Sequence, residues 1–236
     1  MPPIDPTQAL AKIQEFVLMG GPAMIAIAAL SILALTTILW KLWRLSWLGA
    51  WSGGRHTARA LDLWAAGRRP EARAALSGRH HLRPRLVAAA MAAAETPGLT
   101  EAGAREETLR VARGLLLEAR AGLRLIELCA TIGPLLGLFG TVTGMIAAFQ
   151  ALQEAGAQAD PATLAGGIWE ALLTTAAGMA VAIPAQIALT GFESVLDRLR
   201  HDMEDAATRV FVIRPGAQNS PAAPAPTPGA ILRVAE

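Results

Sequence analysis

Charged side chains are missing from most of three long stretches in this sequence of 236 residues. Residues 20–40 and 128–153 contain none, and residues 162–192 contain a single one, Glu170. Each stretch is long enough for a helix that crosses the hydrocarbon core of a bilayer, which takes about 20 residues. With 53% hydrophobic residues and a mean hydropathy of +0.39, the chain is too apolar for an ordinary soluble domain. The sequence therefore predicts three membrane-spanning helices.

Cysteine occurs once and histidine four times. The single cysteine, Cys129, excludes a disulfide within the chain, and its apolar neighbours indicate a small core residue. The histidines lack the spacing, with one another or with acids, of a zinc site; they are His56, His80, His81 and His201. We therefore expect no metal site.

Signatures of soluble enzymes are also missing. The glycines of GLFGTVTG, residues 137–144, follow no predicted strand and lack the lysine of a phosphate-binding loop. No Ser-His-Asp arrangement and no pair of carboxylates in a cleft stands out, so we expect no catalytic residues and no enzymatic activity. In the arginine-rich residues 41–124, acidic residues are interspersed throughout, which indicates a solvated face and no nucleic-acid-binding surface.

The distribution of lysine and arginine predicts the orientation of the spans. Lys12 is the only one before the first span, and residues 154–161 hold none. Fifteen lie in residues 41–124, and five follow Phe192. By the positive-inside rule, the large middle region and the C-terminus are cytoplasmic, while the N-terminus and the 154–161 loop are outside.

These boundaries predict an all-α membrane protein in which the second and third membrane helices extend into a cytoplasmic helical bundle. The predicted segments are an outer N-terminal segment (1–19), a first span (20–40), a cytoplasmic helical region (41–127), a second span (128–153), an outer loop (154–161), a third span (162–192), a cytoplasmic helix (193–214) and a disordered Pro/Ala-rich tail (215–236). Residues 1–19 lack the features of a cleavable signal peptide, and we expect a short amphipathic helix at residues 7–18.

The cytoplasmic region has its own predicted helices. Tryptophans follow the first span with Lys41 and Arg44 between them, as in an interfacial anchor belt; they are Trp40, Trp43, Trp47 and Trp51. Short helices are expected at residues 57–66, 70–76 and 84–94. A longer helix should begin at Glu101 with Thr100 as its cap, and Glu106 is placed to pair with Arg110.

Two apolar stripes with heptad spacing adjoin the second and third spans. The first runs straight into the second span and consists of Leu109, Ala112, Leu116, Ala119, Leu123 and Ile126. The second follows the third span and consists of Leu196, Leu199, Met203, Ala206, Val210 and Ile213. We expect both membrane helices to continue into the cytoplasm and to pack along these stripes. The alternative is two separate amphipathic helices that rest on other surfaces.

Small residues line the second and third spans. Gly133, Gly137, Gly140 and Gly144 lie three or four residues apart and share one helical stripe, and Gly178 belongs to a similar set on the third span. Small residues allow helix backbones to approach closely in lipid. We therefore expect these glycines to pack the two helices against each other.

Hydroxyl groups and one carboxyl lie among these glycines. Counting outwards from the loop places Thr141 at the depth of Thr174 and Thr175, and Glu170 opposite Met145. Such a layer is compatible with a structural hydrogen bond or with an ion or proton path, since carboxyls inside membranes often serve proton relay. Because one chain holds only one such carboxyl, a path requires several copies or a partner with its own acid.

The segments GLFGTVTGM (137–145) and GGIWEALLTTAAGMAVAIPA (166–185) resemble the second and third membrane helices of the MotA/TolQ/ExbB family, most of all its ExbB and TolQ branch. The resemblance covers residues 125–192, and the three-span layout agrees with it, whereas MotA-type stators have four spans. On this resemblance the family's membrane glutamate falls on Glu170, and its pore threonines fall on Thr141 and Thr175. Relatives often carry alanine in place of Thr174 and Pro-Gly in place of Gly166-Gly167.

The resemblance implies a motor in the bacterial inner membrane, with its outer side in the periplasm. Such a motor is a homopentamer, surrounded by membrane lipid, that encloses the single membrane helices of a dimeric ExbD- or TolR-like partner. Protons are the coupling ion and no other cofactor is implied. They pass through the pore with the help of an aspartate on the partner, and the motion energises a TonB- or TolA-like protein that reaches the outer membrane.

Three other interpretations remain at this point. A TolQ-like subunit of an envelope-integrity system is the near alternative to an ExbB-like subunit of outer-membrane transport. A passive membrane scaffold would use Glu170 only to join helices. A secondary transporter is disfavoured by the absence of inverted repeats and by the presence of only three spans.

Overall fold

The computed structural model describes residues 21–50, 54–156 and 161–212. All of its regular elements are helices: α2 (Gly21–Trp47), α3 (Gly54–Ala65), α4 (Arg69–Leu76), α5 (Leu82–Glu95), α6 (Glu101–Arg120), α7 (Leu123–Ala155) and α8 (Pro161–Val212). Helices α2, α7 and α8 are long and apolar enough to cross a membrane. The predicted all-α fold with three spans is therefore confirmed. The expected helix at residues 7–18 and the tail from Pro215 lie outside the described residues.

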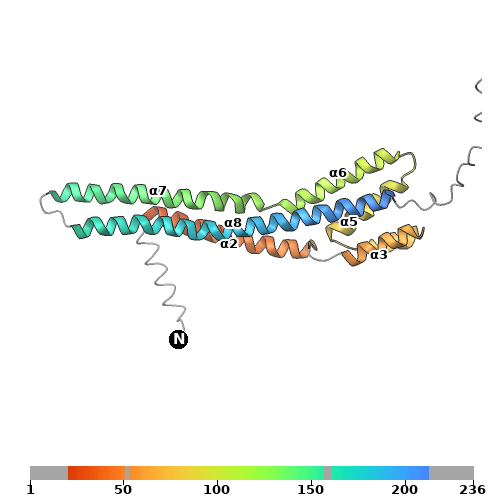
Figure 1. The fold of residues 1–236 in the computed structure, drawn as a ribbon, viewed down its shortest axis with the longest axis horizontal. Coiled ribbons are helices and arrows are strands. Elements are labelled where there is room, and N and C mark those ends of the chain that lie inside the picture. Colours follow the sequence, from red (N-terminus) through yellow and green to blue (C-terminus); the bar gives the residue numbers. More distant parts are fainter. Residues whose placement is uncertain (1–20, 51–53, 157–160, 213–236) are drawn as a thin grey trace, which may run out of the picture. The chain divides into compact units, whose positions relative to one another are not determined.

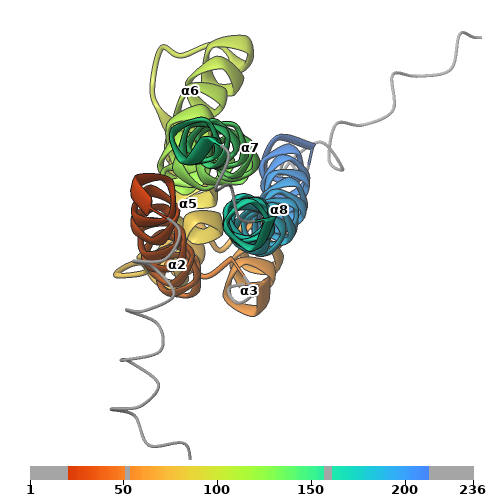
Figure 2. The same ribbon diagram turned by 90° about the vertical axis from the view of Figure 1, so that its left-hand side faces the viewer.

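The chain divides into two compact units, and the first contains Met1–Trp47 and Glu118–Asp197. In this unit α7 and the first part of α8 run antiparallel, side by side (Figure 1). Helix α2 packs along α7, and the view along the helices shows the three together (Figure 2). The buried face of α2 is apolar over most of its length and consists of Ala23, Met24, Ile27, Leu30 and Ala34. Ala23, Ile27, Leu30 and Ala34 follow one another at steps of four, three and four residues, with Met24 next to Ala23, and form one stripe of the helix.

The second unit contains Leu48–Leu117 and Arg198–Glu236. Its core joins α3, α4 and α5 to the last turns of α8 and includes Leu61, Trp64, Leu76, Val87, Met91 and Val210. The indole Nε1 of Trp64 donates to the carbonyl oxygen of Val210 at 3.1 Å, so the one polar atom of that ring is satisfied inside the core. The three short helices expected between the first span and Glu101 are confirmed as α3, α4 and α5.

The apolar stripe predicted after the third span is confirmed on α8. Its residues are all buried: Leu196, Leu199, Met203, Ala206 and Val210. Its last expected member, Ile213, lies outside the described residues. The helix runs without interruption from Pro161 to Val212, so the third span does continue well beyond the length of a membrane crossing.

The stripe predicted before the second span is wrong in one respect, because α6 and α7 are not one helix. Helix α6 ends at Arg120, and Gly122 takes a left-handed conformation with φ +86° before α7 begins. This turn changes the helical phase, so the stripe does not run continuously into α7. Leu109 is 47% exposed, and the buried face of α6 consists of Ala104, Thr108, Leu115 and Ala119.

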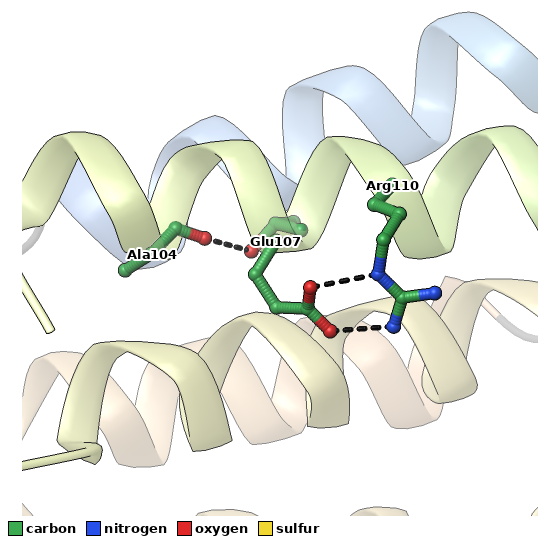
Figure 3. A network of polar contacts seen from close by, with 4 residues as sticks. Ala104, Glu107 and Arg110 are labelled. Atoms are coloured by element: carbon green, nitrogen blue, oxygen red, sulfur yellow. Dashed lines mark hydrogen bonds and ion pairs between the residues drawn. The ribbon is translucent and has the colours of Figure 1, made fainter.

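Of the two predictions made for α6, the cap is confirmed and the partner of the ion pair is wrong. The hydroxyl of Thr100 accepts a hydrogen bond from the N–H of Gly103 at 3.1 Å, which confirms the predicted cap. Arg110 pairs with Glu107 instead of Glu106: its Nε and Nη2 atoms donate to the two carboxylate oxygens at 2.8 and 2.6 Å (Figure 3). The hydrogen bond from Arg110 holds the pKa of Glu107 below its ordinary value.

The end of α2 combines exposed and buried side chains. Trp43 and Trp47 are 61% and 71% exposed, as expected for interfacial anchors, while Trp51 lies outside the described residues. Lys41, which the sequence placed in the same belt, is instead 0% exposed. The anchor interpretation is therefore wrong for Lys41, whose side chain is directed into the protein.

A buried leucine of the α8 stripe and an exposed leucine of α6 give a matched pair of variants. Leu199 is 1% exposed. Truncation of a buried leucine costs about 2–5 kcal/mol, and a buried carboxylate costs more. We therefore expect Leu199→Asp to lower the free energy of unfolding of the second unit by at least that amount. Leu109→Asp introduces the same carboxylate at an exposed position and should change stability by only about 0.5 kcal/mol. Thermal unfolding of both variants in detergent tests this. Equal melting temperatures would contradict the buried stripe.

Candidate functional site

The backbones of α7 and α8 are in direct contact at glycines. A Cβ atom added to Gly137 would lie 2.9 Å from the Cα of Thr175, and one added to Gly133 would lie 2.9 Å from the carbonyl oxygen of Gly178. In the other direction, a Cβ on Gly178 would lie 2.5 Å from the carbonyl oxygen of Gly133. These distances leave no room for a side chain, so each of these positions requires glycine for the two helices to approach this closely.

The same contacts give the register of the antiparallel pair. Gly144 faces Ala171, with 3.1 Å between an added Cβ and the alanine Cβ, and Gly140 faces Thr174. Further towards the loop, Gly167 faces Ala148. This register agrees with the count outwards from the loop, which puts the level of Thr141 beside that of Thr174.

Two threonine hydroxyls of α8 meet one carbonyl of α7. Thr175 donates to the carbonyl oxygen of Gly137 at 3.1 Å, and the hydroxyl of Thr174 lies 3.3 Å from the same oxygen. Thr174 is 2% exposed and also donates to Ala171 within its own helix, at 2.7 Å. The side chain of Thr174 fills the space opposite Gly140 and so packs α8 against α7.

Thr141 lies on α7 at the edge of this contact. It is half-buried, and its hydroxyl donates to the carbonyl oxygen of Leu138 at 2.6 Å. A hydroxyl has one donor and two acceptor sites, so this bond uses its proton and leaves lone pairs for a water or another donor.

Glu170 lies on the side of α8 that faces α2. Its carboxylate oxygen Oε1 is 3.8 Å from a Cβ added to Gly21, the first residue of α2. The side chain is half-buried, and within the described residues no hydrogen bond joins it to Thr141, Thr174 or Thr175. The structure thus brings Thr174 and Thr175 together at Gly137 and places the carboxylate beside a different helix.

The N-terminus of α2 is a favourable place for a carboxylate. The first N–H groups of a helix lack partners within the helix, and the helix dipole is positive at this end. Gly21 has φ +60°, a left-handed conformation that favours glycine and lets the chain turn into α2 beside Glu170.

Sequence reasoning missed Gly21. A glycine at the start of the first span marks a helix boundary in the sequence, but nothing in its spacing pairs it with a glutamate on the third span. Among the residues that the structure describes, no three histidine, cysteine or acidic side chains gather in a metal-binding cluster.

Comparison with known proteins gives one family. Residues 79–205 match the model of the MotA/TolQ/ExbB proton channel family. The chain is 37% identical over 188 residues to the putative biopolymer transport protein ExbB-like 1 of Synechocystis sp., which covers 77% of this chain and 70% of that protein.

Shorter alignments reach both branches of that family. The chain is 46% identical over 65 residues to the biopolymer transport protein exbB1 of Vibrio cholerae, which covers 28% of each chain. It is 48% identical over 68 residues to the Tol-Pal system protein TolQ of Pseudomonas aeruginosa, which covers 28% of this chain and 29% of that protein. This chain therefore spans less than a third of either relative in these two alignments.

The glycine contacts predict opposite outcomes for two alanine substitutions. In Gly140→Ala the new Cβ would lie 2.7 Å from the Cβ of Thr174, so we expect a loss of about 1–3 kcal/mol from overpacking. Gly191→Ala on α8 meets nothing within 4 Å and should leave the stability unchanged or raise it by up to about 1 kcal/mol, because alanine favours helices. Thermal unfolding in the same detergent measures both. A Gly140→Ala protein as stable as Gly191→Ala would disprove the close contact.

Proposed function

Because the chain belongs to the MotA/TolQ/ExbB proton channel family, we propose that it is a motor subunit of a bacterial inner membrane that couples proton flow to the energisation of a TonB-like protein for outer-membrane transport. The relatives named biopolymer transport proteins support an ExbB-like role. The relative named Tol-Pal system protein TolQ supports a TolQ-like role in envelope integrity as the second candidate.

One observation carries the proposal: the described part of the third span holds a single carboxylate, Glu170, at the end of another membrane helix. A carboxylate in a membrane helix is costly and is retained where it faces a bundle interior or a hydrated path. Glu170 accepts a proton from the outer side and releases it towards the hydroxyl layer. Its carboxylate lies beside the N-terminus of α2, which is the positive end of that helix.

The threonines serve as acceptors along this path. Thr175 donates to the carbonyl oxygen of Gly137, and Thr141 donates to that of Leu138, so each hydroxyl directs its lone pairs away from the bond it makes. Such oxygens orient water molecules or hold a hydrated proton. Thr174 is enclosed between the helices and keeps them in register.

The path needs more than one chain. A protomer supplies one membrane carboxylate, and proton transfer through a pore requires a series of polar groups. A homopentamer of this chain around the single-span helices of an ExbD- or TolR-like partner supplies the repeats, and an acid on the partner continues the path. A TonB- or TolA-like protein receives the motion.

Glu170→Gln tests the proton path. The amide keeps the size of the side chain but cannot exchange a proton, so we expect proton flux to fall by about 100-fold or more, with the oligomeric mass unchanged. Glu193→Gln removes an exposed carboxylate from the same helix and should leave the flux unaffected. Flux is measured with a pH-sensitive dye in liposomes that contain the co-purified complex.

The outcomes of that experiment separate the candidates. Wild-type flux in Glu170→Gln would exclude the path, whereas loss of assembly would favour a scaffold in which Glu170 joins helices. Growth tests then divide the two branches: rescue of iron-siderophore uptake indicates the ExbB-like role, and rescue of envelope integrity indicates the TolQ-like role.

Thr175→Val tests the hydroxyl layer. Valine keeps the shape and removes the bond to Gly137, so stability should fall by only about 1 kcal/mol while the flux decreases markedly. Thr143→Val is the matched control, since Thr143 is exposed and donates to carbonyls of its own helix. Equal flux in the two variants would remove Thr175 from the path.

A further inference from the structure

Lys41 on α2 is the one charged side chain that is completely buried in the part of the chain that the structure describes. Its ammonium group donates to the carbonyl oxygens of Ala119 and Ala121, at 2.5 and 2.6 Å. A buried charge is strongly unfavourable unless hydrogen bonds compensate it. These two bonds are therefore the condition for Lys41 to occupy this position.

Ala119 lies in the last turn of α6, and Ala121 lies in the turn that follows it. The last carbonyl groups of a helix have no partner within it, and the helix dipole is negative there, so a cation is favoured. Arg44, one turn further along α2, points Nη2 at the carbonyl oxygen of Glu118 at 3.5 Å. Helix α2 thus supplies two cations to the end of α6.

The turn that follows α6 is held from the same side. Gly122 has φ +86°, and a Cβ added to it would lie 2.7 Å from Cζ3 of Trp40. The indole of Trp40 is itself covered by the guanidinium of Arg44, 5.0 Å from the ring centre. Trp40, Lys41 and Arg44 form what we term the α2 clamp on residues 118–122.

Within the clamp, Lys41 and Arg44 donate hydrogen bonds that join side chains of α2 to residues 119, 121 and 118 of the same unit. In the described part of α2, the hydroxyls of Thr37 and Ser46 bond carbonyls of their own helix. Apart from Lys41, the buried face of α2 is apolar, so its other contacts are van der Waals contacts without the directionality of a hydrogen bond. The axial position of α2 therefore depends on the clamp.

The other end of α2 lies beside Glu170. Gly21 and Lys41 are twenty residues apart on one helix, or about 30 Å at 1.5 Å per residue. Helix α2 is continuous between these two residues, so we expect a shift at Lys41 to be transmitted to Gly21. We propose that Lys41 is a positioning residue that fixes α2 along α7 and thereby sets the surroundings of the Glu170 carboxylate.

The test compares Lys41→Met with Lys41→Arg in the full-length complex in lipid nanodiscs. Hydrogen exchange of residues 118–126 reports on the clamp, and the pH profile of Glu170 labelling by a hydrophobic carbodiimide, read by peptide mass spectrometry, reports on the carboxylate. In Lys41→Met we expect exchange to be about tenfold faster and the labelling midpoint to shift. Lys41→Arg keeps the charge and should retain both properties. Arg113→Met, which removes an exposed cation from α6, is the control.

A labelling profile that stays at the wild-type midpoint while exchange rises would overturn the proposal, since Lys41 would then only cap α6. Unchanged exchange would overturn it as well. If Lys41→Met is not recovered from membranes, Gly122→Ala disturbs the same turn and keeps the lysine, and the same two readouts apply. The inference rests on the proposed function only for the importance of Glu170. A Glu170→Gln complex with wild-type flux would reject that function and leave the labelling result valid.

Discussion

The contact between the backbones of α7 and α8 determines the positions of the other groups in the membrane unit. Lipid is as apolar as the helix surfaces, so burial of apolar area does not by itself bring two membrane helices together. Close packing does, and here it depends on Gly133, Gly137 and Gly178, whose missing side chains let carbonyl oxygens and Cα atoms of the opposite helix approach. The contact also brings Thr175 within hydrogen-bond distance of a carbonyl on α7. The glycines of the contact therefore determine both the close packing of α7 and α8 and the hydrogen bond of Thr175.

Glu170 and Lys41 each lie beside a helix end whose dipole has the opposite sign to the charged form of the side chain. Glu170 lies at the positive N-terminus of α2, and Lys41 lies at the negative C-terminus of α6. In a membrane unit with few charged residues, backbone groups at helix ends take the place of counter-ions. The carbonyl oxygens of Ala119 and Ala121 thus satisfy the buried ammonium group of Lys41 without an ion pair.

Residue spacing predicted the parts of the structure that depend on periodicity. The α8 stripe and the register of the hairpin follow from the helical repeat and from an antiparallel turn, both of which are readable in the sequence. The break at Gly122 was missed because apolar spacing on either side of it looks continuous, while the left-handed turn depends on one glycine. The direction of Lys41 was missed because a lysine between tryptophans suits either an interfacial anchor or a buried cap, and only its contacts decide.

The hydroxyl bonds bear on what the candidate path can conduct. Thr141 and Thr175 each give their proton to a backbone carbonyl, so towards any water they present oxygen lone pairs. Oxygen acceptors stabilise a hydrated proton or another cation and offer nothing to an anion. Glu170, which has the same preference when charged, lies one helical turn from Thr174 on α8. The polar groups of the hairpin are therefore suited to cations, and the carboxylate is the group among them that can take up and release a proton.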